Sequence, residues 1–130
     1  MPPLEDAWKA RRKARRRARM NRELLESLEG EVLGWPGVVG ERGDGITVYR
    51  YGRRQIGHVH HDGVADLPFP REVHERLVSE GRAEPHRGGF RGVVSYRLRS
   101  PEDVPGAVAL FRMGYERARA AAERRAAGQG

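Results

Sequence analysis

The sequence predicts an α+β domain in which helices cover a single antiparallel sheet of four to five strands, with a basic helix in front of it. Residues 4–29 contain no Gly and no internal Pro, as expected of a helix. Residues 35–66 instead alternate apolar and polar side chains between turn residues, which is typical of a meander of strands. A helix, a strand and a last helix follow, and this element order is that of the α+β class.

The chain has 130 residues, enough for one domain with a modest core, because 33% of the residues are charged and 17 are Gly. It contains no Cys, which excludes a disulfide framework, a thiol nucleophile and a Cys-ligated metal. No apolar run reaches the roughly 20 residues of a membrane helix, and the N-terminus lacks the apolar stretch of a signal peptide. We therefore expect a cytoplasmic protein without a membrane span.

Residues 1–30 are expected to form a basic helical arm. Leu24, Leu25 and Leu28 recur at helical spacing and predict that the end of this helix docks on the body. Gly30 is placed to end the helix. Residues 1–22 hold nine Lys and Arg against two acidic residues, which accounts for the whole formal net charge of +7. The rest of the chain is therefore neutral overall.

Two interpretations of this arm remain open. Clustered positive charge predicts a nucleic-acid partner that is bound through its phosphates. The cations that would make these contacts are Arg11, Arg12, Lys13, Arg15, Arg16, Arg17 and Arg19. The alternative is a solvated lead-in helix, because like charges four residues apart repel each other and no aromatic side chain within the run can stack on bases.

The domain itself is expected over residues 31–118. Strands are predicted at residues 37–41, 46–51, 55–61 and 64–67, separated by turns rich in Gly and Asp. A helix then begins after Pro70 at residues 71–80 and is closed by Gly81. An extended piece at residues 83–86, a glycine-rich loop and a strand at residues 93–98 follow. Ser100 caps the last helix, and residues 119–130 are expected to fray.

The densest chemistry lies at the end of the third predicted strand. In a regular strand His58 and His60 share one face, about 6.6 Å apart, while His61 points to the other face. Two imidazoles so placed can share a metal or act as an acid–base pair, and His86 is a third candidate. A metal site needs three or four converging ligands, so we expect no metal and no cofactor from this pair alone. The alternative is a polar sheet face with hydrogen-bonded histidines.

Other polar and aromatic residues are candidate partners of these histidines. Asp62 and Asp66 can each orient an imidazole, although Asp62 also fits a turn and Asp66 a hydrogen-bonded loop. Tyr49, Tyr51 and Tyr96 lie on predicted strands and are candidates for a substrate-binding cavity, with core packing as the alternative. The body contains no Gly-x-Ser-x-Gly elbow, which argues against serine hydrolase chemistry.

Five segments resemble the luciferase-domain family, a group of small bacterial proteins that shares a domain with fungal luciferase. They are Arg54–His60, Asp66–Pro70, Gly81–His86, Val94–Arg99 and Gly114-Tyr115, and the resemblance spans residues 35–116. It implies a luciferase-like oxidoreductase that adds dioxygen to a hydroxylated pyrone, or binds a similar small aromatic molecule, without an organic cofactor. His58, His60 and His86 would be catalytic, supplying a base and holding the oxyanion. Asp62 is counted with them as the catalytic acidic residue that orients an imidazole.

The chain departs from the family pattern at three places. Gln55 stands where a glutamate is expected, and Val93 replaces an aromatic residue whose substrate-binding role Phe90 can take. The arginine arm replaces an apolar membrane segment of the fungal enzyme. More loosely, the element order is similar to the double-wing fold of YjbR-type proteins, for which DNA binding has been suggested. A nucleic-acid-binding module is therefore the alternative function, and a structural protein with neither activity is a third hypothesis.

Overall fold

Six antiparallel strands form one sheet in the computed structural model, which describes residues 3–129. Their order is β1-β2-β3-β4-β6-β5. The strands are β1 (Val38–Arg42), β2 (Ile46–Tyr51), β3 (Arg54–His60), β4 (Val64–Pro68), β5 (Glu84–Pro85) and β6 (Val93–Arg97). The helices are α1 (Leu4–Val32), α2 (Arg71–Ser79), the 3₁₀ turn η1 (Pro101–Asp103) and α3 (Val104–Gln129). The α+β class is confirmed, with one strand more than predicted because β5, only two residues long, pairs with β6.

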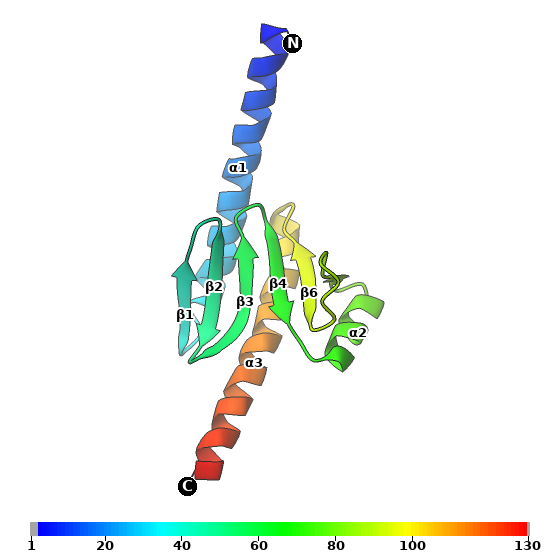
Figure 1. Cartoon of the computed structure of the whole chain (residues 1–130). Coiled ribbons are helices and arrows are strands. Elements are labelled where there is room, and N and C mark those ends of the chain that lie inside the picture. The colour runs from blue at the N-terminus through cyan, green and yellow to red at the C-terminus, as the bar shows by residue number, and fades with distance from the viewer. Residues whose placement is uncertain (1–2, 130) are drawn as a thin grey trace.

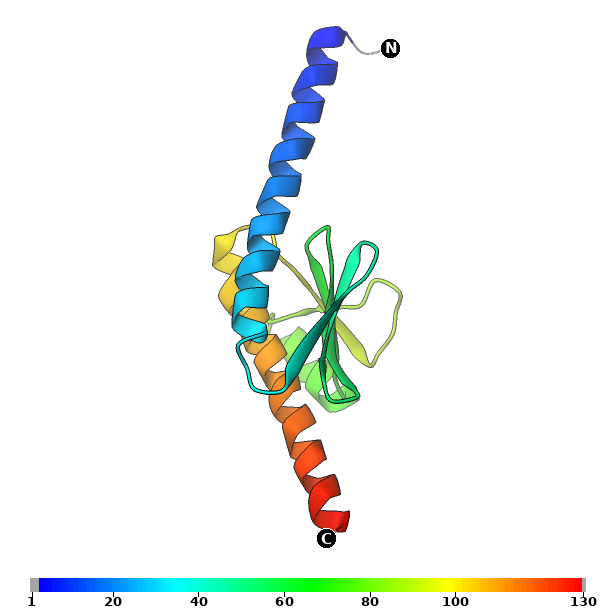
Figure 2. The ribbon, with the colours of Figure 1, turned by 90° about the vertical axis from the view of Figure 1, so that its left-hand side faces the viewer.

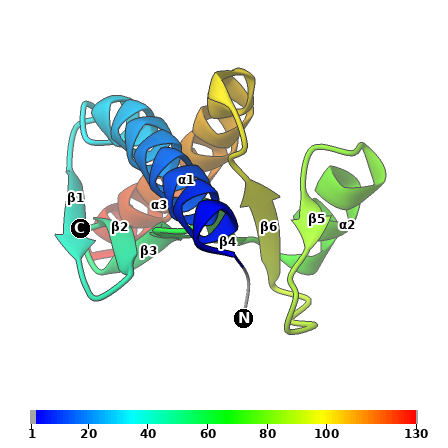
Figure 3. The same ribbon diagram turned by 90° about the horizontal axis from the view of Figure 1, so that it is seen from above.

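The long helices α1 and α3 cover one face of the sheet and leave the other face open (Figures 1 and 2). Seen from above, α1 and α3 lie on the same side of the strands, while α2 lies beyond β6 next to β5 (Figure 3). The loop between β5 and β6 extends on the open side (Figure 2). This arrangement produces one helix-covered face with the core and one open face on which polar side chains can gather.

The core lies between the sheet and the two long helices. Leu28 and Val32 of α1 and Phe111 and Tyr115 of α3 have no exposed surface. Burial of each such side chain contributes about 1.5–3 kcal/mol. Gly57 lets α3 approach β3 closely, since a Cβ there would lie 2.9 Å from Cε1 of Phe111. Helix α3 therefore packs directly behind the strand that carries the histidine pair.

Both long helices extend further than the sequence predicted. Helix α1 continues through Gly30 to Val32, because Val32 adds a fully buried side chain to the core. Helix α3 continues to Gln129, although we predicted fraying after Ala118. Its last part is rich in Ala, Arg and Glu, which favour helix, and Arg119 pairs with Glu123 at 3.8 Å one turn later. Ser100, predicted to cap the last helix, forms a capping box with Asp103 at the 3₁₀ turn that leads into α3.

The two glycines proposed to end helices should respond to alanine with opposite signs. Gly30 lies inside α1 with nothing near its missing Cβ, so Gly30→Ala is expected to raise the free energy of unfolding by about 0.5–1 kcal/mol. Gly81 follows α2 with a φ of +72°, so Gly81→Ala is expected to lower it by about 1 kcal/mol. Urea denaturation measures both changes, and destabilisation by Gly30→Ala would contradict the continuous α1.

Candidate functional site

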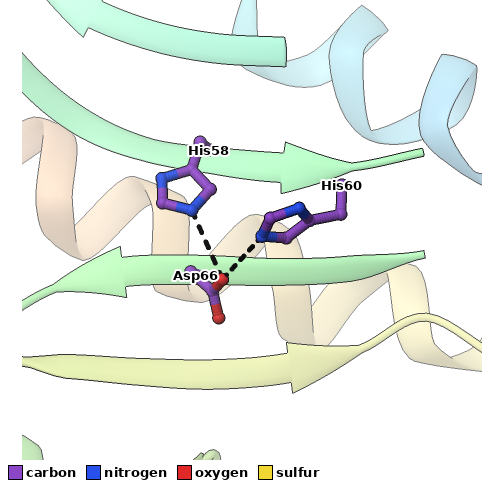
Figure 4. A group of neighbouring side chains, drawn as sticks. All are labelled: His58, His60 and Asp66. Carbon is purple, nitrogen blue, oxygen red and sulfur yellow. Dashed lines mark hydrogen bonds and ion pairs between the residues drawn. The ribbon is translucent and has the colours of Figure 1, made fainter. Parts of the chain in front are cut away.

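Strand β3 presents His58 and His60 together on the open face of the sheet, as the alternation predicted (Figure 4). Their ring centroids lie 5.1 Å apart with the rings nearly perpendicular. His61 comes directly after the strand, and its Nε2 lies 3.1 Å from the hydroxyl of Thr47 beside α1. His58 and His60 therefore lie on the open face of the sheet, and His61 lies on the helix-covered face.

Asp66 of β4 brings the histidines to one point. It pairs with His58 across the β3–β4 ladder, and its side chain is only 5% exposed. Its Oδ2 lies 2.9 Å from Nε2 of His60 and 3.3 Å from Nε2 of His58 (Figure 4). His86, which directly follows β5, places its own Nε2 3.8 Å from the same oxygen. Three imidazoles thus converge on a single buried carboxylate oxygen, and we call these four residues the histidine–aspartate cluster.

Ser95 of β6 holds the other oxygen of Asp66. The two residues are register partners on β4 and β6, and the Ser95 hydroxyl donates a 2.5 Å hydrogen bond to Oδ1. Ser95 was not predicted from the sequence, because its position depends on β4 pairing with β6, a strand that follows α2 in the sequence. Only that register places a hydroxyl next to the carboxylate.

A β-bulge in β3 adds Gln55 to the cluster. The register shifts so that Tyr49 pairs with Gly57 while the next residue, Arg50, pairs with Gln55, which leaves Ile56 as an extra residue. Gln55 therefore reaches His58, three residues later, and its Nε2 lies 2.7 Å from Nδ1 of that ring. The residue that replaces the expected glutamate thus touches a histidine and fixes the orientation of its ring.

His86 has a different hydrogen-bond role from the other two histidines. The backbone N–H of Gly88 donates to Nδ1 of His86 over 2.9 Å. A backbone N–H can only donate, so neutral His86 carries its proton on Nε2 and presents a donor toward Asp66. The exposed Phe90 ring lies 5.2 Å from the His86 ring, centroid to centroid. This loop therefore contributes one hydrogen-bond donor and one aromatic surface to the open face.

The surroundings shift the pKa of two groups in the cluster. Burial by itself would raise the pKa of Asp66, but the hydrogen bonds from Ser95 and His60 and the nearby imidazoles hold it below its ordinary value. Burial lowers the pKa of His58, more strongly than the charge of Asp66 raises it. The cluster therefore favours a charged Asp66 carboxylate beside a neutral His58 imidazole.

The structure places several predicted site residues away from the cluster. Asp62 lies in the turn after β3 and accepts a hydrogen bond from the Val64 backbone N–H over 3.2 Å. Asp66, and not Asp62, therefore contacts the imidazoles. The three tyrosines belong to the helix-covered side, where they contact residues outside the cluster. Tyr49 donates to Glu29 at 2.7 Å, Tyr96 donates to the Asp103 carbonyl at 2.7 Å, and Tyr51 packs edge-on against Tyr115.

Tyr49 and His61 line a separate cavity of about 390 Å³ between α1 and the sheet. It lies on the opposite side of the sheet from His58. The physical reason is the strand alternation, because Tyr49 and Tyr51, two residues apart, both point toward the helices. The structure therefore places these tyrosines in or against the core, which was the alternative interpretation, and away from the histidine pair.

The basic residues of the arm lie on the part of α1 that extends beyond the sheet (Figures 1 and 2). All seven predicted cations, from Arg11 to Arg19, are exposed. Arg17 also donates to the carbonyl oxygens of Leu98 and Arg99, at 3.4 and 3.1 Å, and so links the arm to the body. Within residues 3–129, no helix combines the length and apolar character that crossing a membrane requires.

The fold and site define a small α+β domain with a histidine–aspartate cluster on the open face of its sheet. Residues 53–114 match the family model described as Luciferase domain. The match runs from β3 into α3 and includes all four residues of the cluster, Gln55 and Ser95, whereas the basic arm lies outside it. Residues 53–114 therefore match a luciferase domain, which confirms the resemblance drawn from the sequence. Comparisons with curated proteins and with solved structures found no match.

Proposed function

We propose that this luciferase-domain protein binds a small hydroxylated aromatic or pyrone-like molecule at the histidine–aspartate cluster and promotes its reaction with dioxygen without an organic cofactor. The observation that supports this most is the convergence of three imidazoles on one oxygen of the buried Asp66 carboxylate. The luciferase-domain match over the same residues agrees with oxidative chemistry.

The first step that the cluster favours is removal of a proton from a ring hydroxyl. The 2.9 Å contact with Asp66 places the proton of neutral His60 on Nε2, which leaves Nδ1 with a free lone pair. Nδ1 takes the hydroxyl proton, and the O–H electron pair stays on the substrate as an electron-rich enolate. Asp66 then stabilises the resulting imidazolium, so that His60 and Asp66 act as one base.

Two other groups fit the binding of such a substrate. The Nε2–H of His86 is a donor that can hold the negative oxygen formed by proton removal. The exposed Phe90 ring, next to His86, offers an aromatic surface for a flat substrate ring. Both groups lie on the loop between β5 and β6, which therefore is expected to contribute to substrate specificity.

The test is oxygen uptake with simultaneous photon counting on a panel of hydroxylated pyrones and catechols. We expect uptake by the wild-type chain and a loss of at least about 100-fold in a variant with His58, His60 and His86 all changed to Ala. The matched control is His61→Ala, which removes the neighbouring imidazole from the other side of the sheet and should leave uptake unchanged. Equal uptake by the wild-type chain and the triple variant would refute the assignment.

The exposed arm supports a second candidate function, binding to nucleic acid through phosphates. The test is fluorescence anisotropy with duplex DNA at several salt concentrations. A variant with Arg11, Arg12, Lys13, Arg15 and Arg16 changed to Gln removes five charges but keeps the docked end of α1. Affinity that falls steeply with salt and is lost in this variant would support the arm as the binding element, whereas unchanged affinity would eliminate it.

A further inference from the structure

We propose that His58, His60 and Asp66 bind one divalent first-row transition-metal ion, with His86 beside it as a hydrogen-bond donor rather than a ligand. The proposal rests on the proposed function for the site and its substrate, and it deepens that function by adding a cofactor. With an ion on Nε2 of His60, the proton of that ring moves to Nδ1, and the ion takes over from His60 the role of making the substrate hydroxyl acidic. It also revises the expectation of no metal, which was based on the histidine pair before the structure added Asp66 as a third donor.

The carboxylate oxygen of Asp66 is spaced from the imidazole nitrogens of His58 and His60 as ligands of a single ion are. Two ligands bound about 2.1 Å from one ion, in tetrahedral or octahedral geometry, lie about 3.0 to 3.4 Å apart. Oδ2 of Asp66 lies 2.9 Å from Nε2 of His60 and 3.3 Å from Nε2 of His58. These three atoms lie within 4.8 Å of one another, so an ion between them needs only small side-chain movements.

The surrounding residues support the ligands in the way that metal sites require. Ser95 occupies Oδ1 of Asp66 and leaves Oδ2 to face the imidazoles. Gln55 lies at Nδ1 of His58, and rotation of its amide group by 180° presents Oε1 to an Nδ1–H. That arrangement leaves the lone pair of Nε2 free for an ion, and such outer partners set both the tautomer and the orientation of a ligating histidine.

His86 is excluded from the ligand set by its own hydrogen bond. The Gly88 backbone N–H donates to Nδ1, so Nε2 of the neutral ring carries a proton and has no lone pair to offer. Its distance of 3.8 Å from Oδ2 of Asp66 suits a donor that reaches a water or substrate oxygen bound to the ion. The ligand set is therefore two histidines and one carboxylate.

The type of ion follows from these donors. Two imidazoles and one carboxylate, without sulfur, suit iron(II), cobalt(II) and zinc(II). Iron(II) oxygenases use this same set of two histidines and one carboxylate and leave the other coordination positions of the ion open. The cluster lies on the open face of the sheet, which leaves the remaining positions of an ion accessible to water, substrate or dioxygen. Iron(II) is therefore the expected ion, and cobalt(II) and zinc(II) are suitable probes of the same site.

The experiment is isothermal titration of the untagged, chelator-treated full chain with zinc(II), together with visible spectroscopy of the cobalt(II) form. We expect one ion per chain and cobalt d–d bands of a site with fewer than six ligands. His58→Ala, His60→Ala and Asp66→Asn are each expected to weaken zinc binding by at least about 100-fold, and Gln55→Leu by about 10-fold. His86→Ala is expected to change affinity by less than about threefold while it alters the cobalt spectrum, because it removes only a donor to the bound water.

His61→Ala is the matched control and should bind zinc like the wild-type chain, since His61 lies on the other side of the sheet. Circular dichroism tests whether each variant is folded. If His58→Ala does not fold, His58→Gln replaces it. Absence of binding, or binding unchanged in the folded His58, His60 and Asp66 variants, would overturn the proposal. Oxygen uptake by a metal-free chain would also overturn the metal proposal, while it would leave the proposed function intact. Binding of one ion per chain without oxygen uptake would support the metal site and contradict the oxygenase function.

Discussion

Asp66→Asn is expected to lower oxygen uptake by at least about 100-fold, and the free energy of unfolding by about 2 kcal/mol at pH 7. The side chain is 5% exposed and accepts hydrogen bonds from Ser95 at 2.5 Å and His60 at 2.9 Å. An amide has one acceptor oxygen instead of two, so one of these donors loses its partner. Its uncharged oxygen also cannot stabilise an imidazolium. Uptake and urea denaturation measure the two effects.

The stability effect of Asp66→Asn should depend on pH. The folded protein holds the pKa of Asp66 below its ordinary value, so the unfolded chain takes up this proton at higher pH. The contribution of the charged carboxylate is complete above its unfolded pKa of about 4 and is lost as pH falls through the folded value. The difference in the free energy of unfolding between the wild-type chain and Asp66→Asn is therefore expected to become smaller below about pH 4.

Asp62→Asn is the matched control, because it makes the same chemical change four residues earlier. Asp62 lies in the exposed turn and accepts the Val64 backbone N–H, a bond that an Asn oxygen also makes. We expect a change of less than about 0.5 kcal/mol and no loss of uptake. If both substitutions had the same effect, the special position of Asp66 between Ser95 and the histidines would be refuted.

Gly57→Ala is expected to lower the free energy of unfolding by about 3 kcal/mol. Gly57 is buried in β3, and a Cβ there would lie 2.9 Å from Cε1 of Phe111, 3.1 Å from Cγ of Leu67 and 3.2 Å from the Asp66 carbonyl oxygen. None of these neighbours can move freely, because the two side chains are fully buried and the third is backbone of β4. The methyl group therefore pushes β3 away from α3, and His58 moves with it.

A second substitution separates crowding from other causes. Phe111→Leu removes the ring edge that the new methyl group meets, so Gly57→Ala is expected to cost less in a Phe111→Leu background than in the wild-type chain, by at least about 1 kcal/mol. The four free energies of unfolding of this double-mutant cycle come from urea denaturation. Additive effects would show that close packing of α3 on β3 does not explain the need for Gly57.

Much of the fold was predictable because its signals are local. The alternation in residues 46–51 and 54–60 marks two strands, and glycines with positive φ at positions 45, 52 and 63 lie in the turns beside them. The helices follow from their composition and from the cap at Ser100. The same alternation places His58 and His60 on one face, which required no knowledge of any partner strand.

The composition of the cluster, in contrast, depends on which strands lie side by side. Asp66, rather than Asp62, faces the histidines because it is the register partner of His58 in the β3–β4 pair. Ser95 joins Asp66 because β4 also pairs with β6, a strand that follows α2 in the sequence. Gln55 reaches His58 because a bulge opposite Tyr49 breaks the two-residue period that would otherwise separate them. The face taken by a side chain follows from local backbone geometry, whereas its neighbours across the sheet follow from burial of the whole core.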